Sequence, residues 1–78
     1  MRQPHRVVFT DHAAERAERY GVPWSEVADA VLGEHERRRS NPGAADWLVQ
    51  RGRLVVVYNW PDAADESAAR VVSLWIAG

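Results

Sequence analysis

The stretch RVVFTDHAAERAERYGVPWSEVADAVLGE (6–34) decides the fold, because within it the apolar pattern changes from that of a strand to that of helices. Residues 6–10 are a short apolar run rich in β-branched side chains, which favours a strand. A helix follows, since the side chain of Thr10 or Asp11 can accept a hydrogen bond from its first amides. We predict that this helix extends to about Tyr20, because the next residue is a glycine, which suits the left-handed conformation that closes helices.

A second helix is predicted over VPWSEVADAVLGE (22–34). Pro23 suits the first position of a helix, and Glu26 places a negative charge where the helix dipole favours it. The apolar residues recur at helical spacing, at Trp24, Val27, Ala28, Val31 and Leu32. Such a stripe is typical of a helix that packs one face on the rest of the domain.

Beyond Gly33 the pattern is that of strands and turns. We predict a charged edge strand (36–40), a turn (41–43), two hairpin strands (46–50 and 53–60), a polar loop (61–69) and a final strand (70–77). Arg51-Gly52 suits the tight turn of the hairpin. Side chains alternate between the two faces of a strand. We therefore expect one apolar face in the strand 53–60, made of Leu54, Val56, Tyr58 and Trp60. The strand 70–77 should likewise have one apolar face, made of Val72, Leu74 and Ile76.

This order of elements predicts one α+β domain that spans residues 1–78. The N-terminal strand and the two helices would pack on an antiparallel sheet of three or four strands. A chain of 78 residues, of which 46% are hydrophobic, can bury one small core with little margin. We therefore also expect a homodimer or a protein partner.

The composition excludes several classes of site. The chain has no cysteine, which rules out disulfides and thiolate metal sites. Its three histidines lack metal-ligand spacing, and it has no glycine-rich phosphate loop, so we expect neither a metal nor a cofactor. No apolar run approaches the roughly 18 residues that span a bilayer, and the N-terminus lacks the apolar region of a signal peptide. We expect a cytoplasmic protein with no membrane contact.

The net charge of −1 conceals an uneven distribution along the chain. Residues 11–36 carry seven acids and two arginines, whereas residues 37–60 carry five arginines and one aspartate. An acidic helical half followed by a basic middle often indicates a polyanionic partner such as RNA. All ten basic residues are arginine, which binds phosphate well in a bidentate manner, although GC-rich coding produces the same bias.

His12, Arg16 and Arg19 are the first candidate site residues. Their spacings of four and three place them on one face of the predicted first helix. A histidine can exchange a proton near neutral pH, and guanidinium groups can stabilise the charge of a phosphate. Together they would suit metal-free cleavage of an RNA phosphodiester, with a base for the 2′-hydroxyl and cations for the developing charge. The alternative is that the histidine packs locally and the arginines pair with Glu15 and Glu18 or stay solvated.

The basic middle supplies a second set of candidates, a phosphate-binding surface made of Arg37, Arg38, Arg39, Arg51 and Arg53. Its alternative is a charged edge that discourages aggregation between sheets. Aromatic side chains could stack on bases, and the candidates are Trp47, Tyr58, Trp60 and Trp75. In so short a chain most of them must instead belong to the core.

The sequence resembles a small bacterial family filed among the domains of unknown function. The resemblance is carried by TDHAAERAERYGVPWSEV (10–27), NPGAADWLV (41–49), GRLVVVYNWP (52–61) and ARVVSLW (69–75). The family pattern is His-Ala-x-x-Arg-x-x-Arg-Gly-Ile followed by a helix, and the matching residues here are His12, Ala13, Arg16, Arg19, Gly21 and Val22. The chain departs from the pattern where Tyr20-Gly21 replaces Arg-Gly, and where Ser73 stands in place of a threonine. Trp75 occupies the aromatic position of the same strand.

That family is related to the RelE-, ParE- and BrnT-like toxins, so the resemblance implies their fold of two helices on an antiparallel sheet. The resemblance alone does not fix the activity, because some of those toxins cut messenger RNA, some poison gyrase and others have no assigned activity. Together with the stripe of His12, Arg16 and Arg19 and with the basic middle, it leads us to expect a toxin-type ribonuclease restrained by a cognate antitoxin. His12 would be the general acid or base and Arg16 and Arg19 would stabilise the phosphate, with Ser73, Arg53 and Tyr58 on the sheet side of the site. Two alternatives remain open at this point: a non-catalytic module that binds protein or nucleic acid, and a ParE-like gyrase inhibitor.

Overall fold

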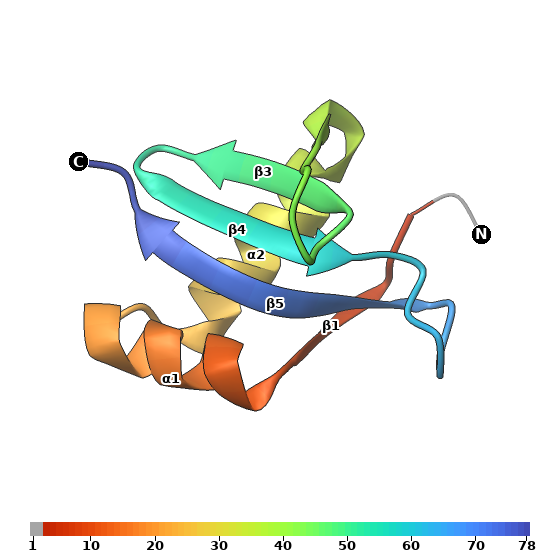
Figure 1. The fold of residues 1–78 in the computed structure, drawn as a ribbon, viewed down its shortest axis with the longest axis horizontal. Coiled ribbons are helices and arrows are strands. Elements are labelled where there is room, and N and C mark those ends of the chain that lie inside the picture. The colour runs from red at the N-terminus through yellow and green to blue at the C-terminus, as the bar shows by residue number, and fades with distance from the viewer. Residues whose placement is uncertain (1–2) are drawn as a thin grey trace.

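A five-stranded sheet carries both helices against one of its faces (Figure 1). The computed structural model describes residues 3–78. Its elements are β1 (Arg6–Phe9), α1 (Asp11–Tyr20), α2 (Trp24–Glu34), the 3₁₀ turn η1 (His35–Arg37), β2 (Arg39–Ser40), β3 (Trp47–Arg51), β4 (Leu54–Asn59) and β5 (Ala68–Ile76). The predicted α+β class is confirmed. Within the described residues, neither helix has the length and apolar character needed to cross a bilayer.

The sheet is mixed, so the prediction of an antiparallel sheet with three or four strands is wrong. The strand order is β1-β5-β4-β3-β2, and β1 runs parallel to β5 whereas all other pairs are antiparallel. Strand β1 pairs with the first half of β5, where Arg6 lies opposite Ala68 and Phe9 opposite Val71. The N-terminal strand thereby satisfies backbone groups along one side, which a strand packed outside the sheet would not do.

Helix α1 has the predicted ends. The Thr10 hydroxyl accepts a hydrogen bond from the Ala13 amide at 3.1 Å, and Gly21 closes the helix with a φ of +68°. Ala13 and Ala17 are fully buried, so their small side chains let the helix backbone approach the sheet closely. The helix lies beside β5, as Figure 1 shows, and Thr10 fixes its first turn there.

Helix α2 ends at Glu34 as predicted, but it begins at Trp24 rather than at residue 22, with Pro23 as its N-cap. Its apolar stripe divides into two parts. Val27 and Val31 are fully buried in the core, whereas 55% of Trp24 and 37% of Leu32 are exposed. Ala30, which lies outside the predicted stripe, is fully buried. The stripe is wider than the surface that the sheet offers to the helix, so one flank remains on the outside.

A bulge in β5 changes which residues face the core. The register between β4 and β5 shifts by one residue at Val72, which has no direct partner on β4. Val71 faces the core before the bulge and Leu74 faces it afterwards, and both are fully buried. The prediction that Val72, Leu74 and Ile76 share one apolar face is therefore wrong, because the extra residue reverses the alternation. On β4 the predicted core face is confirmed, with Leu54, Val56 and Tyr58 in the core.

The remaining strands follow the sequence closely. Gly52 has a φ of +60°, which suits the first position of a two-residue hairpin loop between β3 and β4. The predicted edge strand over 36–40 shortens to Arg39–Ser40, because His35–Arg37 form a 3₁₀ turn at the end of α2. This short, charged strand is one edge of the sheet and β1 is the other.

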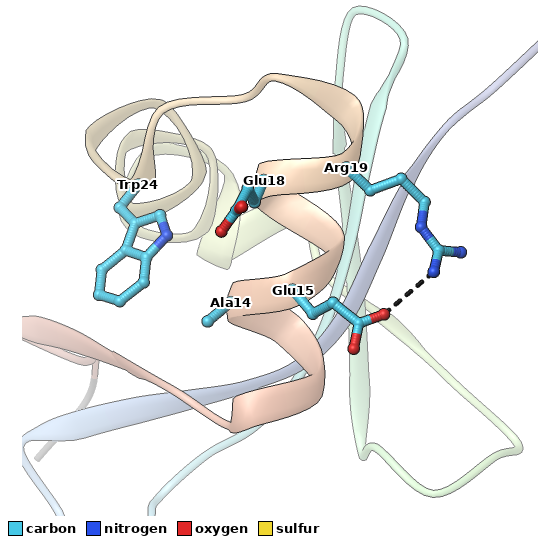
Figure 2. Close-up of a pocket in the computed structure, with 5 residues that line it drawn as sticks. All are labelled: Ala14, Glu15, Glu18, Arg19 and Trp24. Atoms are coloured by element: carbon cyan, nitrogen blue, oxygen red, sulfur yellow. Dashed lines mark hydrogen bonds and ion pairs between the residues drawn. The ribbon is translucent and has the colours of Figure 1, made fainter.

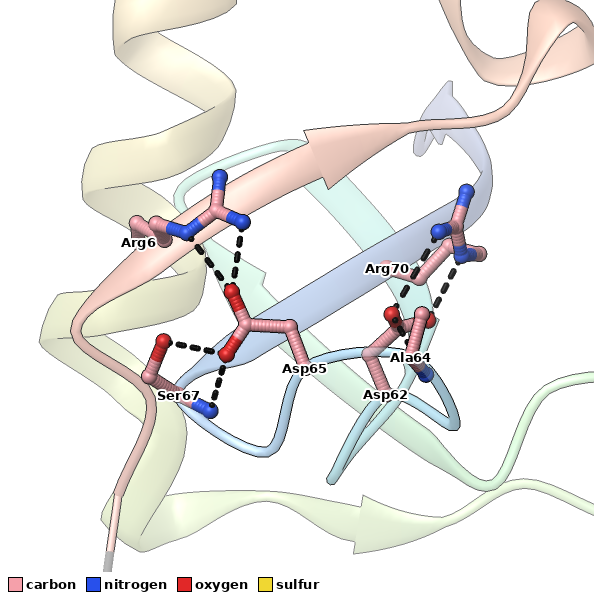
Figure 3. A network of polar contacts seen from close by, with 6 residues as sticks. All are labelled: Arg6, Asp62, Ala64, Asp65, Ser67 and Arg70. Carbon is pink, nitrogen blue, oxygen red and sulfur yellow. Dashed lines mark hydrogen bonds and ion pairs between the residues drawn. The ribbon is translucent and has the colours of Figure 1, made fainter.

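Two ion pairs hold the polar loop before β5 (Figure 3). The Asp65 carboxylate accepts hydrogen bonds from the Ser67 hydroxyl at 2.6 Å and from the Nε of Arg6 at 3.1 Å. The Ser67 hydrogen bonds, and then Arg6, lower the pKa of Asp65 to about 2. Arg70 donates to Asp62 at 2.6 Å and thereby lowers the pKa of that carboxyl. These contacts fix the start of β1 beside the start of β5.

Candidate functional site

The structure brings two of the three residues of the predicted α1 stripe into a row with a third, unpredicted side chain. His12, Arg16 and Tyr20 follow one another at intervals of four residues, and we call them the α1 row. His12 is exposed and Arg16 is half-buried, with Nη1 3.5 Å from the hydroxyl oxygen of Tyr20. The phenol of Tyr20 is 40% exposed, so the row presents an imidazole, a guanidinium and a phenol on one helix flank.

Arg19 does not join this row. Its Nη2 lies 3.0 Å from a carboxylate oxygen of Glu15, one turn earlier on α1, and both side chains are more than half exposed. This ion pair agrees with the alternative prediction for His12, Arg16 and Arg19, in which the arginines of α1 pair with nearby glutamates. An exposed pair of this kind contributes little to stability, but it offsets the charge that Arg19 would offer to a phosphate.

The α1 row lies on the flank of α1 that faces away from α2. Ala14 and Glu18 line the hollow next to Trp24 at the start of α2, and Figure 2 shows them on that side of the helix. His12 is about 160° around the helix axis from Ala14, and Arg16 is equally far from Glu18. The row therefore borders the side of the domain that α2 does not cover.

Ser73 lies on the sheet next to the start of α1. It pairs with Val57 and has the opposite orientation to Leu74, so it belongs to the sheet face that carries no helix. The Thr10 hydroxyl donates to the carbonyl oxygen of Val72 at 3.3 Å, which ties the first turn of α1 to the bulge that precedes Ser73. Among residues 3–78, no hydrogen bond joins Ser73 directly to the α1 row.

Most arginines of the basic middle are held by neighbouring groups. Arg37 and Arg51 both contact the carboxylate of Glu34, each at 3.2 Å. Arg53 donates from Nε to the carbonyl oxygen of Ala77 at 2.9 Å. The single negative charge of Glu34 offsets only one of the two positive charges beside it, but the contacts fix where Arg37 and Arg51 point.

Arg38 and Arg39 differ although they are adjacent. The Arg38 guanidinium lies over the ring of Trp47, with its central carbon 4.4 Å from the ring centroid, and Nη1 donates to the carbonyl of His35 at 3.0 Å. Arg39 is exposed on the short edge strand β2 and has no ion pair within the described part of the chain. Of the five predicted phosphate-binding arginines, Arg39 thus has the fewest contacts with neighbouring groups in the described part of the chain.

Tyr58 is a core residue, which removes it from the candidate nucleic-acid surface. Its side chain is fully buried, and its hydroxyl lies 2.6 Å from Nδ1 of His35. Burial raises the pKa of Tyr58. The expectation that its ring lines the site or stacks on a base is wrong, because no surface of the ring is exposed.

His35 is a buried histidine that the sequence interpretation missed. Only 1% of it is exposed, and burial, followed by the nearby charge of Arg38, lowers its pKa. The signal was present in the sequence, since His35 follows Val27 and Val31 at intervals of four residues and so continues the buried side of α2. Its ring also meets that of Trp60 edge-on, at a centroid distance of 4.8 Å.

The tryptophans divide between the core and the surface. Trp47 and Trp60 pack against the core, and the indole N–H of Trp47 donates to the carbonyl of Trp60 at 3.1 Å. Trp75 is half-buried on β5 opposite Val55, on the sheet face without helices. Among residues 3–78 the structure contains no cluster of three histidine, aspartate or glutamate side chains arranged to hold a metal ion.

Comparison with known proteins identifies no relative. No family model, no curated protein and no solved structure matches the chain. The resemblance to the toxin-related family therefore stays a prediction that depends on the residues quoted for it.

Proposed function

We propose that this chain is a metal-independent ribonuclease, and that the α1 row is its reaction centre. The observation that carries the proposal is the placement of His12 and Arg16 one helical turn apart on the flank facing away from α2. His12 is exposed and Arg16 has no carboxylate partner among the described residues, so both can approach a phosphodiester.

The proposed reaction needs only the RNA and these side chains. His12 takes the proton of a 2′-hydroxyl, whose oxygen attacks the adjacent phosphorus, and the 5′-oxygen leaves with a proton from solvent. The products are a cyclic phosphate and a new 5′-hydroxyl end. Arg16 stabilises the negative charge that grows on the phosphate oxygens. Tyr20 can position the phosphate through its hydroxyl or stack on a base, and Ser73 lies on the adjoining sheet face.

The toxin-like aspects of the proposal follow from the resemblance alone. They are a RelE-like fold, a bacterial source, a ribosome-bound or free RNA substrate, and restraint by an antitoxin protein. A ParE-like gyrase inhibitor would instead produce DNA damage without RNA fragments, and it stays an alternative on the same ground.

The ion pairs of the arginines favour a second candidate function. Arg19, Arg37 and Arg51 are all directed toward carboxylates, so the surface offered to a polyanion is smaller than the sequence suggests. A non-catalytic binding module would need no exposed reaction centre. Salt dependence separates the nucleic-acid and protein versions of this module. Contact with two or three phosphates of single-stranded RNA predicts a slope of about −1.4 to −2.1 in log K against log salt, whereas pairing with an acidic or apolar protein partner should not depend on salt.

Cleavage of a labelled single-stranded RNA by the purified protein tests the proposal. His12→Ala and Arg16→Ala should each lower the cleavage rate by about 100-fold or more. His5→Ala and Arg19→Ala are matched controls, because His5 is another exposed histidine and Arg19 is an arginine of the same helix already paired with Glu15. The controls should retain the wild-type rate within a few fold.

Induction of the same four variants in a bacterial host gives an independent reading. The proposal predicts growth arrest with RNA fragmentation for the wild type and for the controls, and neither effect for His12→Ala. Equal cleavage by wild-type and Arg16→Ala protein, or no cleavage by the wild type, would contradict the ribonuclease assignment and favour the binding module.

A further inference from the structure

Trp24 is the most exposed large hydrophobic residue in the described part of the chain, although its ring is fixed in place. It is the first residue of α2, 55% of it is exposed, and its ring stacks on that of Phe9 in β1 at a centroid distance of 4.7 Å and an angle of 19°. A fixed, exposed tryptophan offers a large contact area that loses little conformational freedom on binding. It is therefore the natural centre of a docking surface.

A groove of about 480 Å³ lies along β1 beside this ring, and we call it the Trp24 groove. Its lining consists of Val7, Val8, Phe9, Trp24, Ser25 and Ala28. A second hollow of about 620 Å³ lies along α1 and is lined by Trp24 together with Ala14, Glu15, Glu18 and Arg19. Figure 2 shows this second hollow, with Ala14 and Glu18 on the side toward the indole. Trp24 therefore lines both the apolar groove and a neighbouring hollow that contains two glutamates and one arginine.

The two edges of the sheet are protected very differently. The β2 edge is only two residues long and carries Arg39, which is how natural proteins guard an edge against further pairing. The β1 edge carries the apolar sequence Val-Val-Phe and is flanked by the Trp24 groove. Among residues 3–78, β1 pairs with no strand other than β5, so its other side presents a row of backbone groups next to an apolar wall. An additional strand beside β1 would pair with these backbone groups and cover the apolar wall.

The charge around the groove indicates the chemistry of the occupant. Glu18 lines the second hollow beside Trp24 and has no ion pair among residues 3–78, while Glu15 is paired with Arg19. Glu26 and Asp29, which follow the lining residues Ser25 and Ala28 in the chain, are exposed. A second copy of this chain would bring the same acids against one another, whereas a segment with lysine or arginine would complement them.

We propose that the Trp24 groove binds an extended segment of another protein, which adds as a strand to the free edge of β1. The segment has apolar side chains that contact Trp24 and Phe9, and a basic side chain that reaches Glu18. Strand β1 spans about 13 Å, so four or so residues of the segment pair with it. This surface lies on the opposite flank of α1 from His12 and Arg16, and the proposal is independent of the ribonuclease assignment.

Binding of short labelled peptides to the full chain tests the proposal. One peptide alternates valine with lysine and the other alternates valine with glutamate, so that they differ only in charge. The lysine peptide should bind at least about 10-fold more tightly, and its binding should shift the amide resonances of β1 and of Trp24. Trp24→Ala should weaken it by about 10-fold or more, as loss of a central interface tryptophan does.

Two further variants keep the test decisive. Ile76→Ala is the matched control, since Ile76 is an exposed apolar residue at the end of β5 that β1 does not reach, and it should leave binding unchanged. Glu18→Lys leaves the apolar groove intact and should lower the preference for the lysine peptide several-fold, which addresses the case in which Trp24→Ala fails to fold.

Three results would overturn the proposal. The first is equal binding of the two peptides, and the second is binding that Trp24→Ala and Glu18→Lys leave unchanged. The third is self-association of the wild type in sedimentation experiments that disappears in Trp24→Ala, because the occupant would then be a second copy of this chain. RNA cleavage is not measured in any of these experiments, so failure here is distinct from failure of the ribonuclease assignment.

Discussion

Lowering the pH below the usual pKa of histidine should destabilise this protein through His35. The folded chain buries His35 almost completely and holds its pKa below the ordinary value of 6.5, through burial and then through the charge of Arg38. The unfolded chain leaves the same imidazole in water. Below pH 6.5 the unfolded state therefore binds a proton that the folded state does not, and this difference favours unfolding.

The size of the effect follows from proton linkage. One proton of difference costs up to about 1.4 kcal/mol of unfolding free energy for each pH unit between 6.5 and the lowered pKa of the folded state. Above pH 6.5 both states hold a neutral His35 and the contribution is constant. A domain of this length has a total stability of about 4 to 12 kcal/mol, so one or two pH units remove a substantial part of it.

Urea denaturation at intervals between pH 5 and pH 8 measures this slope. The wild type should lose stability steadily below pH 6.5, and His35→Gln should lack that part of the slope whatever its absolute stability. His5→Gln and His12→Gln are the controls, since both positions are exposed, and they should keep the wild-type slope. If His35→Gln does not fold, the His35 imidazole resonance of the wild type should titrate below pH 6.5. A wild type and a His35→Gln variant with equal slopes would refute the argument.

Three further substitutions test the fold. Thr10→Ala removes the hydroxyl that caps α1 and binds the Val72 carbonyl, and it should lower the unfolding free energy by about 1 kcal/mol in urea titrations. Leu74→Ala should cost about 2 to 5 kcal/mol, whereas Val72→Ala at the half-buried bulge should cost clearly less in the same assay. Asp65 has a pKa of about 2 in the folded protein, so its contribution is present above pH 3.8 and is lost as the pH falls through 2. Asp65→Asn should remove that part of the acid unfolding curve measured by circular dichroism.

The helices could be predicted because their signals are local. Thr10 and Gly21 define the two ends of α1 within the chain itself, and both make the expected contacts. The bulge at Val72 could not be predicted in this way, since it exists only in the pairing of β5 with β4. The parallel pairing of β1 with β5 is likewise a long-range event, joining segments about sixty residues apart, and no alternation pattern within β1 specifies it.

The candidate site shows the same division between local and distant contacts. The pair of Arg19 with Glu15 follows from their spacing of four residues, so the sequence alone predicts it as one alternative. The contact between Arg51 and Glu34 crosses from the hairpin to the end of α2, and spacing does not reveal it. For Tyr58 the sequence supports two predictions that conflict. Alternation along β4 places it in the core, which is confirmed, whereas its aromatic ring and hydroxyl suggest a surface role, which is wrong.

Folding brings part of the acidic segment (11–36) next to part of the basic segment (37–60). This arrangement explains why we propose two binding surfaces, the α1 row and the Trp24 groove, rather than one. Glu34 lies where the acidic and basic segments meet, and it draws Arg37 and Arg51 toward the end of α2. At this C-terminal end of α2, the negative charge of Glu34 offsets part of the positive charge of Arg37 and Arg51. At the other end of α2 no arginine of the basic middle forms an ion pair within residues 3–78, so the acids near Trp24 keep their charge and favour a basic partner. The cation left for a phosphate on α1 is Arg16, on the opposite flank of that helix from Glu18. The proposed peptide groove and the proposed RNA site therefore lie on different sides of the same two-helix layer and share no residue.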